Sequence, residues 1–132
     1  MGLLASIFTW WNGATIGTAL YTRRNGVRVG SDDWGNVYYE ARTAGEDGLK
    51  RRWVIFNGSN DASRVPPEWH GWLHHTTDML PEALPAPRAW QKPAVPNMTG
   101  TSAAYRPAGA LESGGVRAAS TGDYEAWSPD AA

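Results

Sequence analysis

Three histidines and an aspartate lie close together in the chain and are its first candidates for chemistry. His70 and His74 are four residues apart, His75 follows, and Asp78 lies three residues beyond. On a helix, the four-residue spacing places two imidazoles on one face, where they can bind a metal ion. The glutamate of the HExxH zinc motif is absent, because Gly71 stands in its place. We therefore expect these histidines to bind backbone groups or line an interface, with a small metal-dependent enzyme as the alternative.

Charged pairs are the other candidates. Asp32, Asp33 and Glu40 offer carboxylates for acid–base catalysis, but the first two lie in a run of turn-forming residues, which accounts for them better. Arg51 and Arg52 offer a grip for phosphate or anionic lipid, yet two arginines opening a strand usually form a solvated or ion-paired edge. The sequence has no nucleophile elbow, phosphate-binding loop or dinucleotide motif. It therefore predicts neither catalytic residues nor a cofactor.

The composition favours contact surfaces over a large core. The chain has 132 residues, a formal net charge of −1, eight tryptophans, five tyrosines and no cysteine. Without cysteine, disulfides and cysteine-ligated iron–sulfur clusters are excluded. Valine, isoleucine, leucine and phenylalanine together number only 20, fewer than ordinary globular domains carry. Amphipathic aromatic rings suit surfaces that meet another molecule, and the near-neutral charge argues against nucleic acid as a partner.

The first 22 residues carry no charged side chain, and arginines follow them. Polar residues and glycines interrupt this stretch, so we expect no membrane span and no signal peptide. Over residues 3–12 the apolar side chains fall on one side of a helix, which predicts an amphipathic helix lying on a membrane surface or packed on a partner protein. The residues expected at this contact are Leu3, Ile7, Trp10, Trp11, Arg23 and Arg24.

Residues 23–80 predict a small module. Alternating apolar and β-branched residues, separated by turn signals, indicate three antiparallel strands. The expected strands are 27–29, 37–40 and 51–56. A short helix follows from Pro66, with Trp69 and Trp72 on one face. A sheet this small needs a helix or a partner over one of its faces.

The character of the chain changes at Pro81. Residues 81–132 hold seven of the nine prolines but only four of the 20 aliphatic and phenylalanine residues, so they cannot build a core. Spaced aromatic residues predict a strap laid along partners; they are Trp90, Tyr105, Tyr124 and Trp127. The expected fold is irregular α+β, with an N-terminal amphipathic helix, a small three-stranded antiparallel sheet, one short helix and a long extended C-terminal coil. Its expected parts are 1–22, 23–80 and 81–132.

Three blocks of sequence are distinctive. They are Val29-Gly30-x-Asp32-x-x-Gly35-Asn36-x-Tyr38-Tyr39-Glu40, Arg51-Arg52-Trp53-Val54 and Val65-Pro66-Pro67-Glu68-Trp69-His70-x-Trp72-Leu73-His74. In this order they resemble the family of a small accessory subunit of respiratory complex I, the proton-pumping NADH:ubiquinone oxidoreductase. The family includes the mimitin-type assembly-factor paralogue. Ten arginines against two lysines, with no mitochondrial-type presequence, favour a bacterial member.

The resemblance implies a chain without a redox centre that stabilises or helps assemble the membrane-proximal hydrophilic arm. Its expected partners are other complex I subunits, especially those carrying iron–sulfur clusters near the quinone site, with lipid headgroups as a second candidate. Its expected location is peripheral, on the cytoplasmic side of a bacterial inner membrane or the matrix side of the mitochondrial one. A transient assembly chaperone is the alternative role. The expected partner-binding residues are Trp34, Tyr38, Tyr39, Arg51, Arg52, Trp53, Pro66, Pro67, Trp69, His70, Trp72, His74, Trp90, Tyr105 and Trp127.

Overall fold

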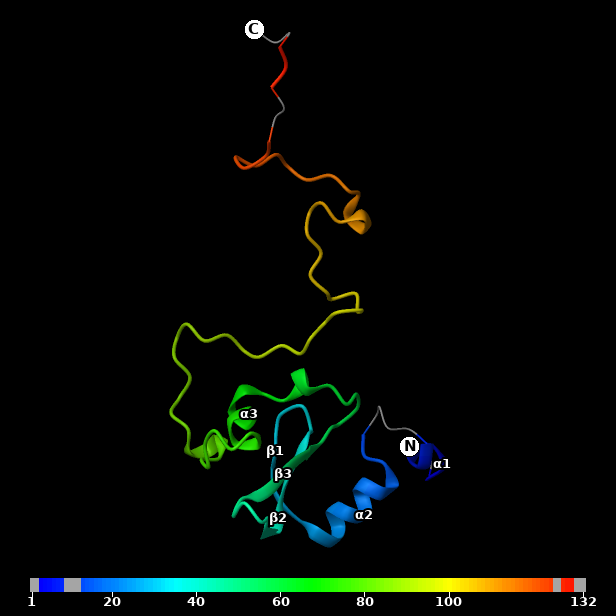
Figure 1. Ribbon diagram of the computed structural model, residues 1–132, viewed down its shortest axis with the longest axis vertical. Coiled ribbons are helices and arrows are strands. Elements are labelled where there is room, and N and C mark those ends of the chain that lie inside the picture. The colour runs from blue at the N-terminus through cyan, green and yellow to red at the C-terminus, as the bar shows by residue number, and fades with distance from the viewer. Residues whose placement is uncertain (1–2, 9–12, 125–126, 130–132) are drawn as a thin grey trace. The chain divides into compact units, whose positions relative to one another are not determined.

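A three-stranded antiparallel sheet lies at the centre of the first part of the chain (Figure 1). The structure is a computed structural model that describes residues 3–8, 13–124 and 127–129. The chain divides into two units, Met1–Asn97 and Met98–Ala132, which are described separately. The sheet, both longer helices and the aromatic core belong to the first unit. The α+β class and the order of elements expected from the sequence are confirmed.

The strands follow one another in space in chain order. They are β1 (Gly26–Ser31), β2 (Val37–Ala44) and β3 (Lys50–Ile55). A β-bulge between Arg28 and Gly30 shifts the β1–β2 register, so that Gly30 pairs with Tyr38. Each strand extends beyond its predicted range at one end or both, because the sequence signals mark where apolar side chains alternate and not where backbone pairing stops.

Helix α3 (Pro67–Leu73) covers one face of the sheet. Its side chains Trp69 and Trp72 are buried, and the ring of Trp69 stacks on Tyr38 with centroids 4.0 Å apart and planes 3° from parallel. Trp72 meets both rings edge-on. Val65 completes this buried cluster. The predicted helix after Pro66 is therefore confirmed, and its tryptophan face packs on the sheet of its own chain.

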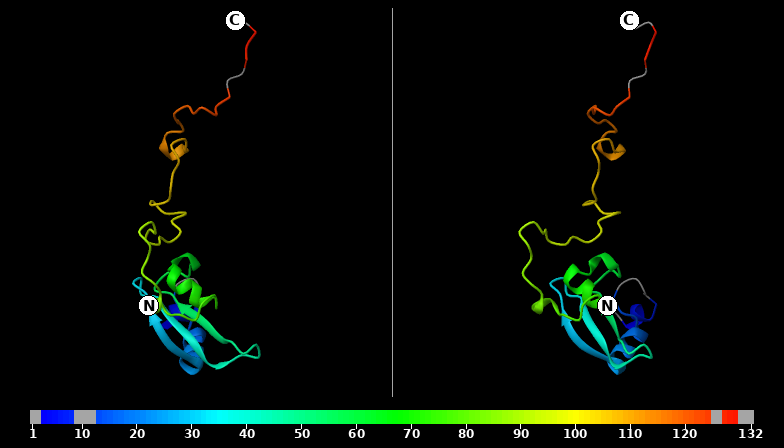
Figure 2. Two further views of the ribbon diagram at one scale, coloured as in Figure 1. Left: turned by 90° about the vertical axis from the view of Figure 1, so that its left-hand side faces the viewer. Right: turned by 60° about the vertical axis from the view of Figure 1, so that its left-hand side comes forward.

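Helix α2 (Ile16–Asn25) covers the opposite face, since successive residues of a strand point to opposite sides (Figures 1 and 2). Tyr39, next to Tyr38, faces Trp53 across the strands, and Trp53 donates a hydrogen bond of 3.0 Å from Nε1 to Thr22 of this helix. Periodicity did not predict α2, because its apolar residues form no stripe. A Thr15 N-cap and two arginines in its last turn stabilise it instead.

The N-terminal helix is present as α1 (Leu3–Phe8). Leu4, Ile7 and Phe8 have exposed side chains, and the contact of this helix with a membrane surface or a partner protein stays a prediction. The predicted continuation of this helix over 9–12, with Trp10 and Trp11, lies outside the described residues.

The second unit has no core among its described residues, every one of which is exposed or half-exposed. Tight turns, the 3₁₀ turn η3 (Leu111–Ser113) and two local ion pairs shape its backbone. These pairs join Arg106 to Glu112 and Arg117 to Asp123. The expected long coil at the C-terminus is confirmed. The two ion pairs each close a short loop within it.

Replacing Gly30 by alanine should destabilise the first unit. A Cβ built on Gly30 would lie 2.7 Å from Cη2 of Trp69, whose ring is held by Tyr38 and cannot move freely. We expect Gly30→Ala to lower the free energy of unfolding by about 2 kcal/mol, a typical cost of overpacking. Urea unfolding followed by circular dichroism measures this value.

Gly17→Ala is the matched control. A Cβ on Gly17 would have only Thr15 Oγ1 within reach, at 3.9 Å, and the position lies in helix α2. Alanine should therefore be neutral or stabilise by up to about 1 kcal/mol. Equal urea midpoints for the two variants would contradict the close approach of Trp69 to β1.

Candidate docking surface

The turn between β1 and β2 is organised by Asp32, whose carboxylate accepts four hydrogen bonds. The donors are the backbone N–H of Trp34 and of Asn36, the side-chain amide of Asn36 and the hydroxyl of Tyr38, at 2.8–3.0 Å. A carboxylate used in this way has no free lone pair in a useful direction for catalysis. The interpretation of Asp32 as a turn-forming residue is thus supported, and its role extends into the core through Tyr38.

Asn36 is fully buried and joins three separate segments. Its Nδ2 donates to Asp32 and to the carbonyl of Arg64, both at 2.8 Å, and its Oδ1 accepts from the backbone N–H of Asn57 at 3.0 Å. Arg64 returns a bond of 2.8 Å from its guanidinium to the carbonyl of Asn57. The residues around Asn36 indicate only a turn, since nothing in its neighbours reveals partners 21 and 28 residues away.

Arg52 connects the sheet to the end of helix α3. Its side chain is only 8% exposed and donates to Glu40 at 3.1 Å, to the carbonyl of Trp72 at 2.8 Å and to Asp78 at 2.6 Å. Its guanidinium carbon also lies 4.7 Å from the centre of the Trp72 ring. A cation beside the last carbonyls of a helix is favourable. Arg52 is therefore occupied within the chain, whereas Arg51 beside it is exposed.

The structure sorts the residues predicted for partner binding by their exposure. The buried residues are Tyr38, Trp69 and Trp72, and Arg52 is largely buried and paired with Glu40. Half-buried are Trp34, Tyr39, Trp53 and Pro66. Exposed are Arg51, Pro67, His70, His74, Trp90, Tyr105 and Trp127, together with Ile7, Arg23 and Arg24 at the N-terminal end. Leu3 lies in helix α1. The exposed set is the part of the prediction that can meet a partner without unfolding the module.

His70 is exposed on helix α3, and His74 and His75 are exposed just after its end. The rings of His70 and His74 have centroids 4.3 Å apart, and His75 adopts a positive φ of 57°. Asp78, the carboxylate that the alternative metal site would use with His70 and His74, pairs with Arg52. Within the described ranges, no three side chains of the metal-ligating types gather in one place.

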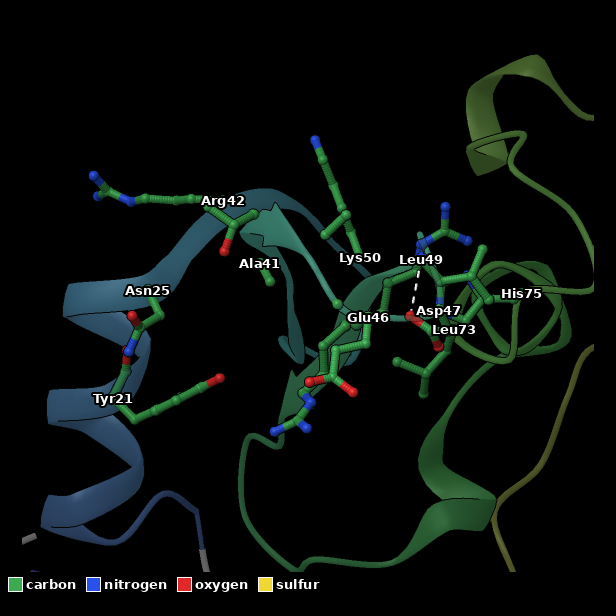
Figure 3. Close-up of a pocket in the computed structure, with 15 residues that line it drawn as sticks. Tyr21, Asn25, Ala41, Arg42, Glu46, Asp47, Leu49, Lys50, Leu73 and His75 are labelled. Carbon is green, nitrogen blue, oxygen red and sulfur yellow. Dashed lines mark hydrogen bonds between the residues drawn. The ribbon is translucent and has the colours of Figure 1, made fainter.

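An open cavity of 980 Å³ lies at the β2–β3 hairpin. Figure 3 shows Tyr21 and Asn25 of helix α2 on one side and His75 on the other. Side chains of both charges line it, including Lys50 and Glu46. Lys50 is already paired with Glu40 at 3.4 Å. This mixture offers no single-sign site for an ionic ligand and no acid–base pair of distinct environments.

Together these features define a class of protein. Several polar side chains hold a small module together, and outside the Tyr38, Trp69 and Trp72 core many large apolar side chains of the described part of the chain are exposed. This is the arrangement of an accessory module that binds other proteins.

The family model for NADH ubiquinone oxidoreductase subunit NDUFA12 matches residues 26–129. The chain belongs to this family, whose members are non-catalytic accessory subunits of complex I. The match begins at the first residue of β1, so it covers the whole sheet, α3 and most of the coil.

Curated relatives agree with this membership. The chain is 43% identical over 98 residues to NADH dehydrogenase [ubiquinone] 1 alpha subcomplex subunit 12 of Dictyostelium discoideum, covering 70% of each chain. It is 47% identical over 68 residues to the probable subunit of that name in Caenorhabditis elegans, covering 48% of this chain and 45% of the nematode one. An uncharacterized protein of Rickettsia prowazekii is 39% identical over 57 residues, 42% of this chain and 57% of its own. The chain thus spans about half the length of the latter two.

Among the described residues, no helix is both long enough and apolar enough to cross a bilayer.

The alkaline stability of the module should depend on one tyrosine. Burial, and then the hydrogen bond to the Asp32 carboxylate, raises the pKa of Tyr38 far above its ordinary value of 10. Above pH 10 the unfolded chain loses this proton and the folded chain keeps it. The free energy of unfolding should therefore fall as the pH rises, by up to about 1.4 kcal/mol per pH unit from this group.

Urea titrations between pH 9 and 11.5 measure this slope. Tyr38→Phe removes the titrating group, so its slope should be shallower than that of the unmodified chain, whatever its stability at neutral pH. Tyr105→Phe is the control, because Tyr105 is 88% exposed and should leave the slope unchanged. Identical slopes in all three proteins would show that Tyr38 ionises in the folded state as readily as in the unfolded one.

Proposed function

We propose that this chain stabilises, or helps to assemble, the membrane-proximal hydrophilic arm of respiratory complex I by binding several of its subunits at once. The observation that carries the proposal is the exposure of the spaced aromatic residues. Trp90, Tyr105, Tyr124 and Trp127 are 75–88% exposed in the isolated chain. These exposed rings add no packing energy to the isolated chain. Burying them against neighbouring subunits would supply favourable binding free energy.

The two units divide this task. The first has a small core and fixed loops, so its surface loses little conformational entropy when a partner binds. The second has no core in its described part, and its exposed aromatic rings are available to other surfaces. An extended chain covers about 3.3 Å per residue, so the second unit can reach more than one subunit. Membership of a complex I family supports these subunits as the partners.

Helix α2 supports a peripheral location at the membrane. Ile16 and Leu20 are exposed on it, and Arg23 and Arg24 follow in its last turn. Apolar side chains followed by cations suit the interface of an anionic bilayer. We propose that this end of the chain faces the membrane, on the cytoplasmic side in a bacterium or the matrix side in a mitochondrion.

Replacing the aromatic residues of the second unit should release the chain from the enzyme. The test variant changes Tyr105, Tyr124 and Trp127 to alanine, and the control changes Ser102, Thr121 and Ser128 to alanine. Interface aromatics often contribute about 2 kcal/mol each. Native gels of membranes, stained for NADH dehydrogenase activity, should show the aromatic variant dissociating at lower detergent or salt than the control.

The same gels distinguish a subunit from a transient assembly factor. A subunit migrates with the active, fully assembled enzyme, whereas a factor is found only with incomplete forms. Equal retention of the aromatic and serine–threonine variants would refute the role given to the coil. Absence of the chain from all forms of the enzyme would refute the proposed function itself.

The arginines of α2 should control binding to lipid. Arg23→Gln with Arg24→Gln should weaken binding of the chain to vesicles of one-third phosphatidylglycerol, by about 1 kcal/mol for each charge, with a loss that shrinks at high salt. The matched control, Arg88→Gln with Lys92→Gln, removes two cations elsewhere in the first unit. Equal losses in both variants would show only a general charge effect, and the membrane-facing role of α2 would be wrong.

A further inference from the structure

A cleft of 380 Å³ lies beside the Asp32 turn, away from the hairpin cavity. Its walls come from the β1–β2 turn, the start of helix α3 and the segment that follows η2 (Pro81–Ala83). Flat apolar surfaces line much of it, from Trp34, Trp69 and Pro66 on the module and from Pro81 and Pro93 on the returning segment.

The walls are held in place by contacts already described and by two further ones. The carbonyl of Trp34 accepts a hydrogen bond of 3.2 Å from the side chain of Asn57, and its N–H donates to Asp32. The returning segment is tied down where the backbone N–H of Asn97 donates to Ser63 at 2.9 Å. The cleft is therefore formed before any partner arrives, which lowers the cost of binding.

Two carboxylates at this cleft lack a cation. Asp33 and Glu68 both line it, both are exposed, and neither forms an ion pair with a described residue. Asp32 also lines the cleft, but its oxygens are occupied by four internal donors. The charge left at the rim is thus supplied by Asp33 and Glu68, on two different elements.

We propose that this cleft binds the side chain of an arginine from a neighbouring polypeptide. A guanidinium is planar and weakly hydrated, so it can stack on tryptophan and proline faces while its N–H groups bind carboxylates. The two rim carboxylates provide the opposite charge that such a group needs. This assignment rests on the proposed function in one respect, namely that the arginine belongs to a subunit docked on this face.

The cations of the chain itself are the competing occupants. Lys92 precedes the wall residue Pro93, and Arg88 lies four residues earlier. Both are exposed, and neither is ion-paired within the described part of the chain. A lysine ammonium is a compact, strongly hydrated charge and stacks less well on flat rings. Substitution of Lys92 separates this case from a partner's arginine.

Peptide titration of the full chain tests the cleft without the enzyme. The probes are acetyl-Gly-Arg-Gly-amide, the same peptide with lysine, and the same peptide with citrulline, which keeps the shape of arginine without its charge. Nuclear magnetic resonance follows the indole N–H of Trp34. We expect the arginine peptide to bind at least about fivefold more tightly than the lysine one, and the citrulline peptide not to bind.

Variants locate the binding. Glu68→Gln and Asp33→Asn should each weaken the arginine peptide about tenfold, the usual loss of a charge-assisted hydrogen bond. Glu46→Gln removes an exposed carboxylate from the β2–β3 hairpin and should change nothing. Equal effects of Glu46→Gln and Glu68→Gln, or equal binding of the arginine and lysine peptides, would overturn the assignment. So would a Lys92→Ala variant in which the Trp34 signal moves without peptide, because the chain's own lysine would then fill the cleft.

Membranes carrying the assembled enzyme supply the second measurement. Glu68→Gln should dissociate from the enzyme at lower salt than Glu46→Gln, as measured by the fraction of chain retained on native gels. If the unmodified chain is retained and both variants leave at the same salt, the cleft proposal fails while the proposed function stands. If the unmodified chain is absent from the enzyme but the peptide titration succeeds, the proposed function fails and the arginine site remains.

Discussion

The stacking of Tyr38 on Trp69 is the contact on which the rest of the first unit depends. A three-stranded sheet buries little by itself, and this chain has few aliphatic side chains to add. Two flat rings 4.0 Å apart supply that burial over a small area, and Gly30 leaves the space that the Trp69 ring needs. The pair also fixes the position of α3, because Trp69 lies in that helix while Tyr38 lies in the central strand.

Hydrogen bonds of polar side chains join the segments of this module, as packing of aliphatic side chains does in larger domains. Asn36 joins three segments, Asp32 links the turn to the Tyr38 hydroxyl, and Arg52 holds the end of α3 on the sheet. Such buried networks stabilise through the members that have partners, because an unpaired buried polar group costs about 1–3 kcal/mol. In this network Nε of Arg64 is buried without a hydrogen-bond partner, while the bonds of Asn36, Asp32 and Arg52 are made. The module consequently has well-fixed loops despite its small core, and fixed loops are what a docking surface requires.

The division of the chain into a small rigid module and a coreless coil accords with membership of a family of accessory subunits. The module holds Asp32, Asn36 and Arg52 in internal hydrogen bonds, and the coil keeps its aromatic rings exposed. Neither arrangement prepares a reaction. Both suit the contacts proposed above, the first through a surface of defined shape and the second through rings spaced along the chain. The arginine cleft joins these two modes, because the segment leading into the coil forms one of its walls.

The sequence by itself determined the local elements and the kind of function. Alternation and turn signals located the three strands, Pro66 marked the start of α3, and the loss of aliphatic residues marked the coil, because each depends on neighbours in the chain. The three sequence blocks also led to the family. Only the tertiary structure decided which residues face inward. Helix α2 has no apolar stripe and is held by Thr22 and by Tyr21 against Trp53, and Arg52 and Asn36 find partners 20 or more residues away. Those contacts depend on how the elements are placed in space, which no local pattern encodes; the register shift after Arg28, which pairs Gly30 with Tyr38, is a further feature of this kind.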